Sequence, residues 1–94
     1  MSDKENNVQV APFKQEDITI PKPKKELTNG QRLIGVNFNP AENPDVYEIK
    51  LVAAYLHDRI TKLKDRHEDV PRWKAAAKTY VEIGSMLAVK GVVA

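Results

Sequence analysis

The chain has 94 residues, of which 41% are hydrophobic and 6% aromatic, with a formal net charge of +2 and no cysteine. This length predicts one small domain with an aliphatic core, and the lack of cysteine excludes a disulfide framework and a thiolate metal site. The small charge argues against duplex DNA or a membrane surface as partner. No apolar run approaches the roughly 20 residues that span a bilayer, and the first ten residues lack a signal-peptide pattern.

Residues 1–30 are predicted to form a flexible N-terminal arm, because they are polar, contain three prolines and show no helical or strand period. The run from Ile20 to Lys25 should be extended and polyproline-like. Two roles remain open for the arm: a solvated tail, or a basic segment that closes over a ligand or a neighbouring subunit. In the second role the docking contacts would come from Phe13, Ile18 and Ile20.

Residues 28–44 are predicted to form turns around one short apolar segment. Thr28, Asn29 and Gly30 have the composition of a turn. The apolar residues 31–38 are too few for periodicity to separate a strand from a short helix, and a lone strand has no partner here. We therefore expect a short helix or an extended segment packed on the main helices, followed by a defined loop up to Pro44.

The first long helix is predicted from about residue 45 to about residue 66. Asn43 can cap it, and Pro44 can occupy the first helical position, where a missing N–H costs nothing. Its apolar residues recur at steps of three and four, which places them on one face: Ile49, Val52, Ala53, Leu56, Ile60 and Leu63.

The second long helix is predicted from about residue 72 to about residue 90. Asp69 can cap it, and Pro71 is tolerated in the first turn. A four-three alternation runs along it through Trp73, Ala77, Tyr80, Gly84, Leu87 and Gly91. A glycine inside a helix costs about 1 kcal/mol relative to alanine, so Gly84 indicates the close approach of another helix.

Together these elements predict an all-α fold, in which residues 31–94 form an antiparallel two-helix hairpin with a short N-terminal element. Two helices of this length bury too little apolar surface for secure stability, and disulfides and metal ligands are missing as supplements. We therefore expect the hairpins to assemble as a homo-oligomer.

The residues offer little for catalysis or metal binding. Ser85 has no histidine within four residues, and Ser2 belongs to the arm. His57 and His67 lie ten residues apart, so we expect surface or interface histidines rather than metal ligands. No glycine-rich phosphate loop is present. We therefore predict a binding protein that is not an enzyme, with no catalytic residue, no metal and no cofactor.

A phosphate-bearing nucleotide is the ligand that the remaining side chains suit. Lys50 and Arg59 supply cations for phosphates, and Phe38 and Tyr47 supply flat faces for bases. Trp73 and Tyr80 are better explained as core residues, whereas core and ligand roles are equally open for Phe38 and Tyr47.

Residues 36–93 resemble the helical hairpin domain of phage anti-CBASS protein two, which also occurs in Thoeris anti-defence protein one. The resemblance rests on the lead NFNPAENPDVYEIK into the first long helix and on the closing motif YVEIGSMLAVK. The chain departs from the pattern in its long arm and at Ala41-Glu42, where such proteins often have Ser-Gly. Glu42 thereby adds a negative charge near the expected ligand.

The resemblance implies a phage protein that acts in the host cell cytoplasm as a sponge for cyclic oligonucleotide messengers. Such proteins hold cyclic di- and trinucleotides without cleaving them, which blocks CBASS immunity, and they assemble as hexamers with dinucleotide pockets between protomers. On the matched motif, Phe38 and Asn39 would contact a base and Pro40 would shape the loop. Lys50 and Arg59 are expected to contact phosphate on their chemistry alone.

Two other functions remain open from the sequence. A small helical module could bind a host or phage protein through its apolar stripe and its C-terminal tail. A binder of single-stranded nucleic acid is disfavoured by the net charge of +2.

Overall fold

The computed structural model describes residues 18–94, and in these residues the chain forms three helices and no strand. The all-α prediction is therefore confirmed for this part of the chain. Most of the predicted flexible arm, residues 1–17, lies outside the described residues. Residues 18–27 contain no regular element and lead into the first helix.

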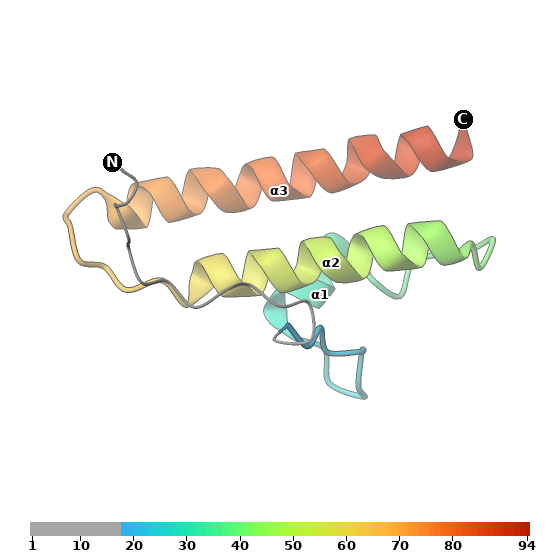
Figure 1. Ribbon diagram of the computed structural model, residues 1–94, viewed down its shortest axis with the longest axis horizontal. Helices are drawn as coiled ribbons and strands as arrows, with labels where there is room; N and C mark the ends of the chain where they lie inside the picture. The colour runs from blue at the N-terminus through green and yellow to red at the C-terminus, as the bar shows by residue number, and fades with distance from the viewer. Residues whose placement is uncertain (1–17) are drawn as a thin grey trace, which may run out of the picture.

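The helix α2 (Pro44–Thr61) lies between α1 (Asn29–Ile34) and α3 (Val70–Val93), as Figure 1 shows. α2 and α3 run side by side in opposite directions, and residues 62–69 connect them. α1 packs mainly on α2 and also contacts α3.

The short helix α1 begins where the sequence predicted a turn, so that prediction is wrong. Thr28 caps α1, because its hydroxyl accepts from the Gln31 N–H at 3.1 Å while the Gln31 side chain accepts from the Thr28 N–H at 3.0 Å. Because of this reciprocal capping box, residues with the composition of a turn form the start of a helix. Gly35 ends α1 with a φ of 79°, a left-handed conformation that favours glycine.

α2 begins as predicted and ends earlier. The Asn43 side chain accepts from the N–H groups of Asp45 at 2.8 Å and Val46 at 3.2 Å, which confirms the cap. The helix stops at Thr61 rather than near residue 66, and Lys74 of α3 donates to the Leu63 carbonyl at 2.8 Å. Tertiary contact with α3 therefore takes over a carbonyl that a longer α2 would have used.

α3 is longer than predicted at both ends, since it runs from residue 70 to residue 93. Asp69 is its N-cap residue, but its side chain makes no capping hydrogen bond, so that part of the prediction is wrong. Its backbone is helical, with a φ of −88° and a ψ of −8°, and the carboxylate lies 3.4 Å from Arg72 instead.

The buried hydrophobic side chains within residues 18–94 are few: Val36, Val46 and Ala54. The six-residue alternation predicted on α3 is called the α3 stripe here (Trp73, Ala77, Tyr80, Gly84, Leu87 and Gly91). It borders α2 only in part: Trp73 and Ala77 line a pocket with Ile60 of α2, and Gly84 lines a groove with Val52 and Leu56. Three of its members are largely exposed, at 52% for Trp73, 72% for Tyr80 and 61% for Leu87. This corrects the assignment of Trp73 and Tyr80 as core residues. α3 turns an adjacent face towards α2, on which Ser85 is buried.

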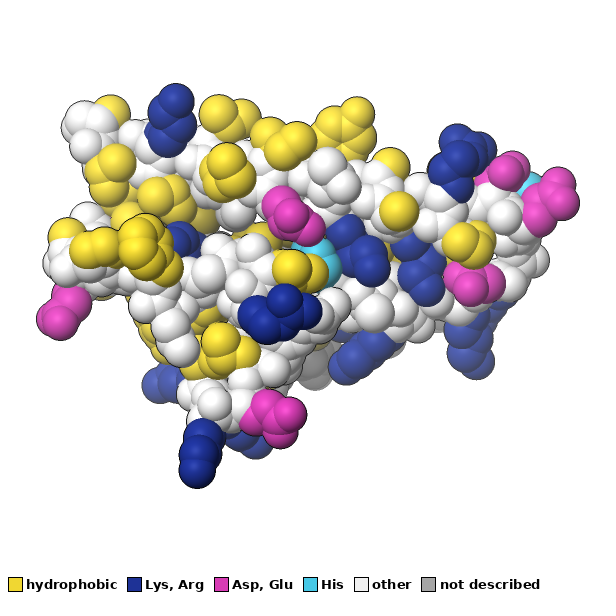
Figure 2. Space-filling model, turned by 180° about the vertical axis from the view of Figure 1, so that it is seen from behind, with side chains coloured by type: hydrophobic (Ala, Val, Ile, Leu, Met, Phe, Trp, Pro, Cys, Tyr) yellow, Lys and Arg dark blue, Asp and Glu magenta, His cyan; other side chains and the backbone are white. Residues whose placement is uncertain are grey.

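Figure 2 shows apolar side chains gathered along α3 and over the loop beside its C-terminal end. None of the helices within residues 18–94 is both long and apolar enough to cross a membrane.

Candidate functional site

The candidate site is built around the loop that joins α1 to α2, which we call the site loop (residues 35–43). The Asn39 side chain closes this loop on itself: its amide donates to the Asn43 carbonyl at 2.8 Å, and its oxygen accepts from the Asn43 N–H at 3.1 Å. Asn43 in turn caps α2. The loop is therefore fixed to the start of a helix by local hydrogen bonds.

Phe38 projects from this loop with 70% of its surface exposed. Lys50, which lies two turns into α2, holds the loop from the side. Its ammonium donates to the carbonyls of Gly35, at 3.2 Å, and of Phe38, and it lies 5.3 Å from the centre of the Phe38 ring. An exposed aromatic face thus sits beside a cation, in a loop with defined contacts.

Four of the six predicted ligand residues line one shallow hollow between the site loop and the end of α3. These are Phe38, Asn39, Pro40 and Lys50, and the opposite wall is formed by Val89 and Val93 of α3. The two valines were not predicted as site residues. Their spacing of four places them on one face of a helix, but only the packing of α3 against α2 shows that this face meets the loop.

Tyr47 lines a second, larger depression on the other side of the loop, with a volume of about 440 Å³. The two hollows share Asn39 and Asn43. Other polar groups around this depression are Asn37 and Glu42, so its lining is more polar than that of the first hollow. A volume of this size falls within the range of about 300–1,000 Å³ that is usual for small-molecule sites.

Arg59 does not join the other five predicted residues within one chain. It lies nine residues beyond Lys50 on α2, which corresponds to about 14 Å along the helix. There it lines a separate small pocket with Pro21, Thr28 and Tyr55. Of the two residues predicted to contact phosphate, only Lys50 therefore lies close to Phe38 within a single copy of the chain.

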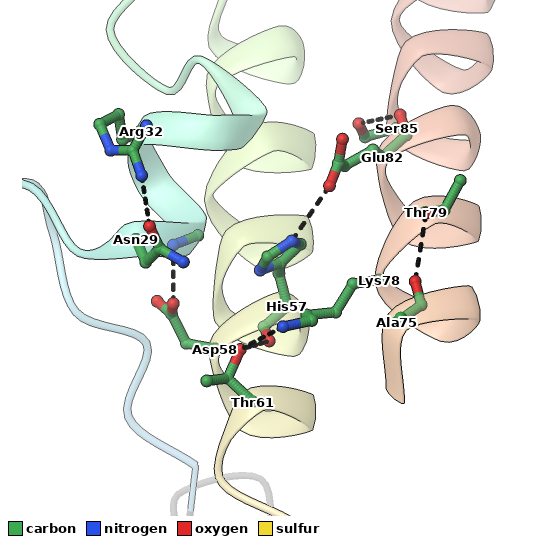
Figure 3. Close-up of polar contacts among 11 residues, drawn as sticks. Asn29, Arg32, His57, Asp58, Thr61, Ala75, Lys78, Thr79, Glu82 and Ser85 are labelled. Atoms are coloured by element: carbon green, nitrogen blue, oxygen red, sulfur yellow. Dashed lines mark hydrogen bonds and ion pairs between the residues drawn. The ribbon is translucent and has the colours of Figure 1, made fainter. Parts of the chain in front are cut away.

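The two histidines have structural contacts. His57 is 1% exposed, which corrects the expectation of a surface or interface histidine, and its Nε2 lies 3.2 Å from Glu82 of α3. Figure 3 shows this contact bridging α2 and α3. His67 stacks on Trp73, with ring centres 5.6 Å apart. No group of three or more potential metal ligands occurs within residues 18–94.

A second apolar surface lies between the long helices, away from the site loop. It is a groove of about 480 Å³, with Val52 and Leu56 of α2 on one wall and Gly84 and Ala88 of α3 on the other. Val52 and Leu56 are 47% and 49% exposed. The groove is also lined by Ile49 and Ala53, so four of the six apolar residues predicted on one face of α2 border it.

Comparison of the chain with protein-family models, with curated proteins and with solved structures gave no match in any of the three.

Proposed function

We propose that the chain is a phage anti-defence protein that binds cyclic di- and trinucleotides and holds them without cleavage, which would block CBASS immunity in the host cytoplasm. The observation that carries the proposal is the Phe38 ring, which is 70% exposed and yet held by a lysine and a closed loop. An aromatic face that is already in place stacks on a base at low entropic cost.

The polar groups around Phe38 suit the rest of a nucleotide. The Asn39 amide uses one of its two N–H donors within the loop, which leaves the other for a base edge. Tyr47 offers a phenol in the adjoining depression, and Lys50 adds positive charge to the wall of the first hollow. Val89 and Val93 add an apolar wall opposite the ring.

The backbone of the site loop also agrees with the resemblance to the anti-CBASS hairpin domain. Glu42 has a φ of 51°, in the left-handed region that glycine adopts most readily. Glu42 stands at the position where the resembling proteins often have glycine. The same loop conformation would suit both sequences, although the carboxylate here weakens the attraction of a phosphate.

We further propose that the antiparallel pair of α2 and α3 is a hairpin that assembles as a homo-oligomer, a hexamer by the resemblance. The α3 stripe alternates small and large residues at the four-three spacing that lets one helix pack against another. Its largest members are exposed in the single chain, and the core within residues 18–94 contains few buried hydrophobic side chains. A second copy would remove this apolar surface from water.

Calorimetric titration with a panel of cyclic di- and trinucleotides tests the binding function. We expect micromolar or tighter binding, with intact ligand recovered after the protein is denatured. Phe38→Ala should weaken binding about 5- to 150-fold, since stacking on an aromatic ring contributes about 1–3 kcal/mol per base. Leu33→Ala, which truncates an exposed side chain on α1, is the control and should bind normally. Absence of heat with every cyclic nucleotide, or cleaved ligand, would refute the proposal.

Light scattering tests the assembly, with two variants that each add one carboxylate to an exposed position of α3. Leu87→Glu places the charge on the α3 stripe and should dissociate the oligomer. Thr79→Glu places it outside the stripe and should leave the mass unchanged. A wild-type chain that is folded and monomeric would refute the assembly, and equal masses for the wild type and both variants would exclude the stripe as the contact.

A helical module that binds another protein is the second candidate, and the open groove between α2 and α3 favours it. The groove has an apolar wall from each helix and small residues along the α3 side, which suits an inserted amphipathic helix. A monomeric wild-type chain that binds no cyclic nucleotide would make this function the better explanation.

A further inference from the structure

Lys50 contacts the backbone of the site loop as well as the Phe38 ring, and this bears on how the proposed ligand site works. We propose that Lys50 is a positioning residue, which fixes Phe38 for stacking by holding the backbone of the site loop, and that it does not act by direct contact with phosphate. The inference rests on the proposed function for its ligand, but its structural half concerns the free protein alone.

The contacts of the ammonium group span one tight turn. The Gly35 carbonyl accepts from the Phe38 N–H at 2.9 Å and from Lys50 at 3.2 Å. The Phe38 carbonyl accepts from the same ammonium. Lys50 therefore binds both ends of the turn from Gly35 to Phe38, and two of its three N–H donors are used there.

The ring of Phe38 is fixed by the same group. Its centre lies 5.3 Å from the Lys50 nitrogen, within the range of a cation–π contact. Because the ring is largely exposed, it has few packing contacts of its own to choose one orientation. One side chain supplies both the cation beside the ring and the donor to the Phe38 carbonyl. Loss of the Lys50 side chain therefore frees the backbone and the ring together.

The contacts of Lys50 in the ligand-free chain also argue against a role in direct phosphate binding. The side chain is only partly exposed, and its ammonium would have to leave two carbonyls before it could bind an anion directly. Such an exchange would release the turn that presents Phe38. A lysine that stays in place keeps the aromatic face ordered and still contributes its positive charge to the surroundings.

Three variants of the full chain test the inference. Lys50→Met keeps the length of the side chain and removes its charge and donors, and Lys50→Arg keeps charge and donors. Lys90→Met removes one charge from an exposed position of α3 and is the control for net charge. Circular dichroism first establishes that each variant keeps the helix content of the wild type.

Amide hydrogen exchange on the free proteins is the first measurement. We expect the Phe38 amide to exchange at least about tenfold faster in Lys50→Met, with wild-type rates in Lys90→Met and substantial recovery in Lys50→Arg. In the wild type, the side-chain protons next to the Lys50 nitrogen should also show the upfield shift caused by an aromatic ring. An unchanged Phe38 exchange rate in Lys50→Met overturns the inference, whatever the ligand proves to be.

Titration with the cyclic nucleotide that the wild type binds is the second measurement. Lys50→Met should lose about tenfold in affinity, and most of this loss should persist at high salt, because it comes from disorder of Phe38. A direct phosphate contact would instead give a loss that shrinks as salt rises, and this result overturns the inference. If the wild type binds no cyclic nucleotide, the proposed function fails, while the exchange rates still decide whether Lys50 holds the loop.

Discussion

Gly84 lies inside α3 with open space around it, and its replacement by alanine distinguishes an isolated chain from an assembled one. A methyl group built at this position meets no atom of the described chain within 4 Å. For the isolated chain, Gly84→Ala should therefore stabilise the fold by about 1 kcal/mol, the difference in helix propensity between the two residues. In a domain of this size that is a rise of about 4–8 °C in Tm.

If a second helix packs closely at Gly84, the same substitution should destabilise the protein instead of stabilising it. A methyl group forced into a well-packed contact costs about 1–3 kcal/mol, so the net effect on the assembled protein is a loss of up to about 2 kcal/mol. Because we propose that the α3 stripe pairs with another copy, we expect Gly84→Ala to lower both the Tm and the mass of the assembly.

Thermal melts at two protein concentrations, together with light scattering, measure both effects. Ala75→Gly is the matched control, because it makes the reverse substitution at an exposed position of α3 outside the stripe. It should lower the Tm by an amount that follows helix propensity and leave the mass unchanged. A Tm for Gly84→Ala that rises by about 4–8 °C, equally at both concentrations and with no change of mass, would refute close packing at Gly84.

Three further substitutions test the contacts of α1 and of the site loop, each by urea denaturation. Gly30→Ala should cost about 3 kcal/mol, because the new methyl group would lie 2.5 Å from the Ala54 carbonyl oxygen. The shift that relieves this clash would also disturb the hydrogen bond from the Gly30 N–H to Asp58, which is 2.7 Å long. An unchanged urea midpoint would contradict that packing. Asn43→Ala should cost about 1–2 kcal/mol through the lost cap of α2, and a loss below the error of the measurement would contradict the cap. Glu42→Gly should stabilise the chain by up to about 1 kcal/mol, because it relieves a left-handed backbone, and a destabilised variant would show that the loop gains nothing from glycine there.

The sequence predicted helix ends well where the interactions involve only residues that are neighbours in the chain. The Asn43–Pro44 start of α2 was predicted correctly, because a cap needs only the residues next to it. The predicted apolar stripe of α2, in contrast, contains none of the residues that α2 buries, which are Val46, Ala54 and His57. Asp69 was correctly predicted as the N-cap residue of α3, but its side chain does not form the expected capping hydrogen bond. A helical backbone at that residue turns its carboxylate towards Arg72, and side-chain preference alone does not fix the backbone angles.

Periodicity showed that α3 has an apolar stripe and could not show which way it faces. Two faces lie next to each other on this helix: the α3 stripe, which alternates small and large residues, and a face with Val81, Ser85 and Val89. The second face packs against α2, where Ser85 is buried. His57 was misjudged for a similar reason, since both its burial and its contact with Glu82 depend on how α3 packs against α2.

The sequence by itself determined the helical class, the start of α2 and the residues of the site loop, because these follow from interactions within a few positions of the chain. The tertiary structure decided which predicted ligand residues meet. It brings Phe38, Asn39, Pro40 and Lys50 to one hollow with two valines of α3, and it leaves Arg59 about two and a half turns away along α2. The physical reason is that such contacts depend on how helices pack, and that packing joins residues far apart in the chain.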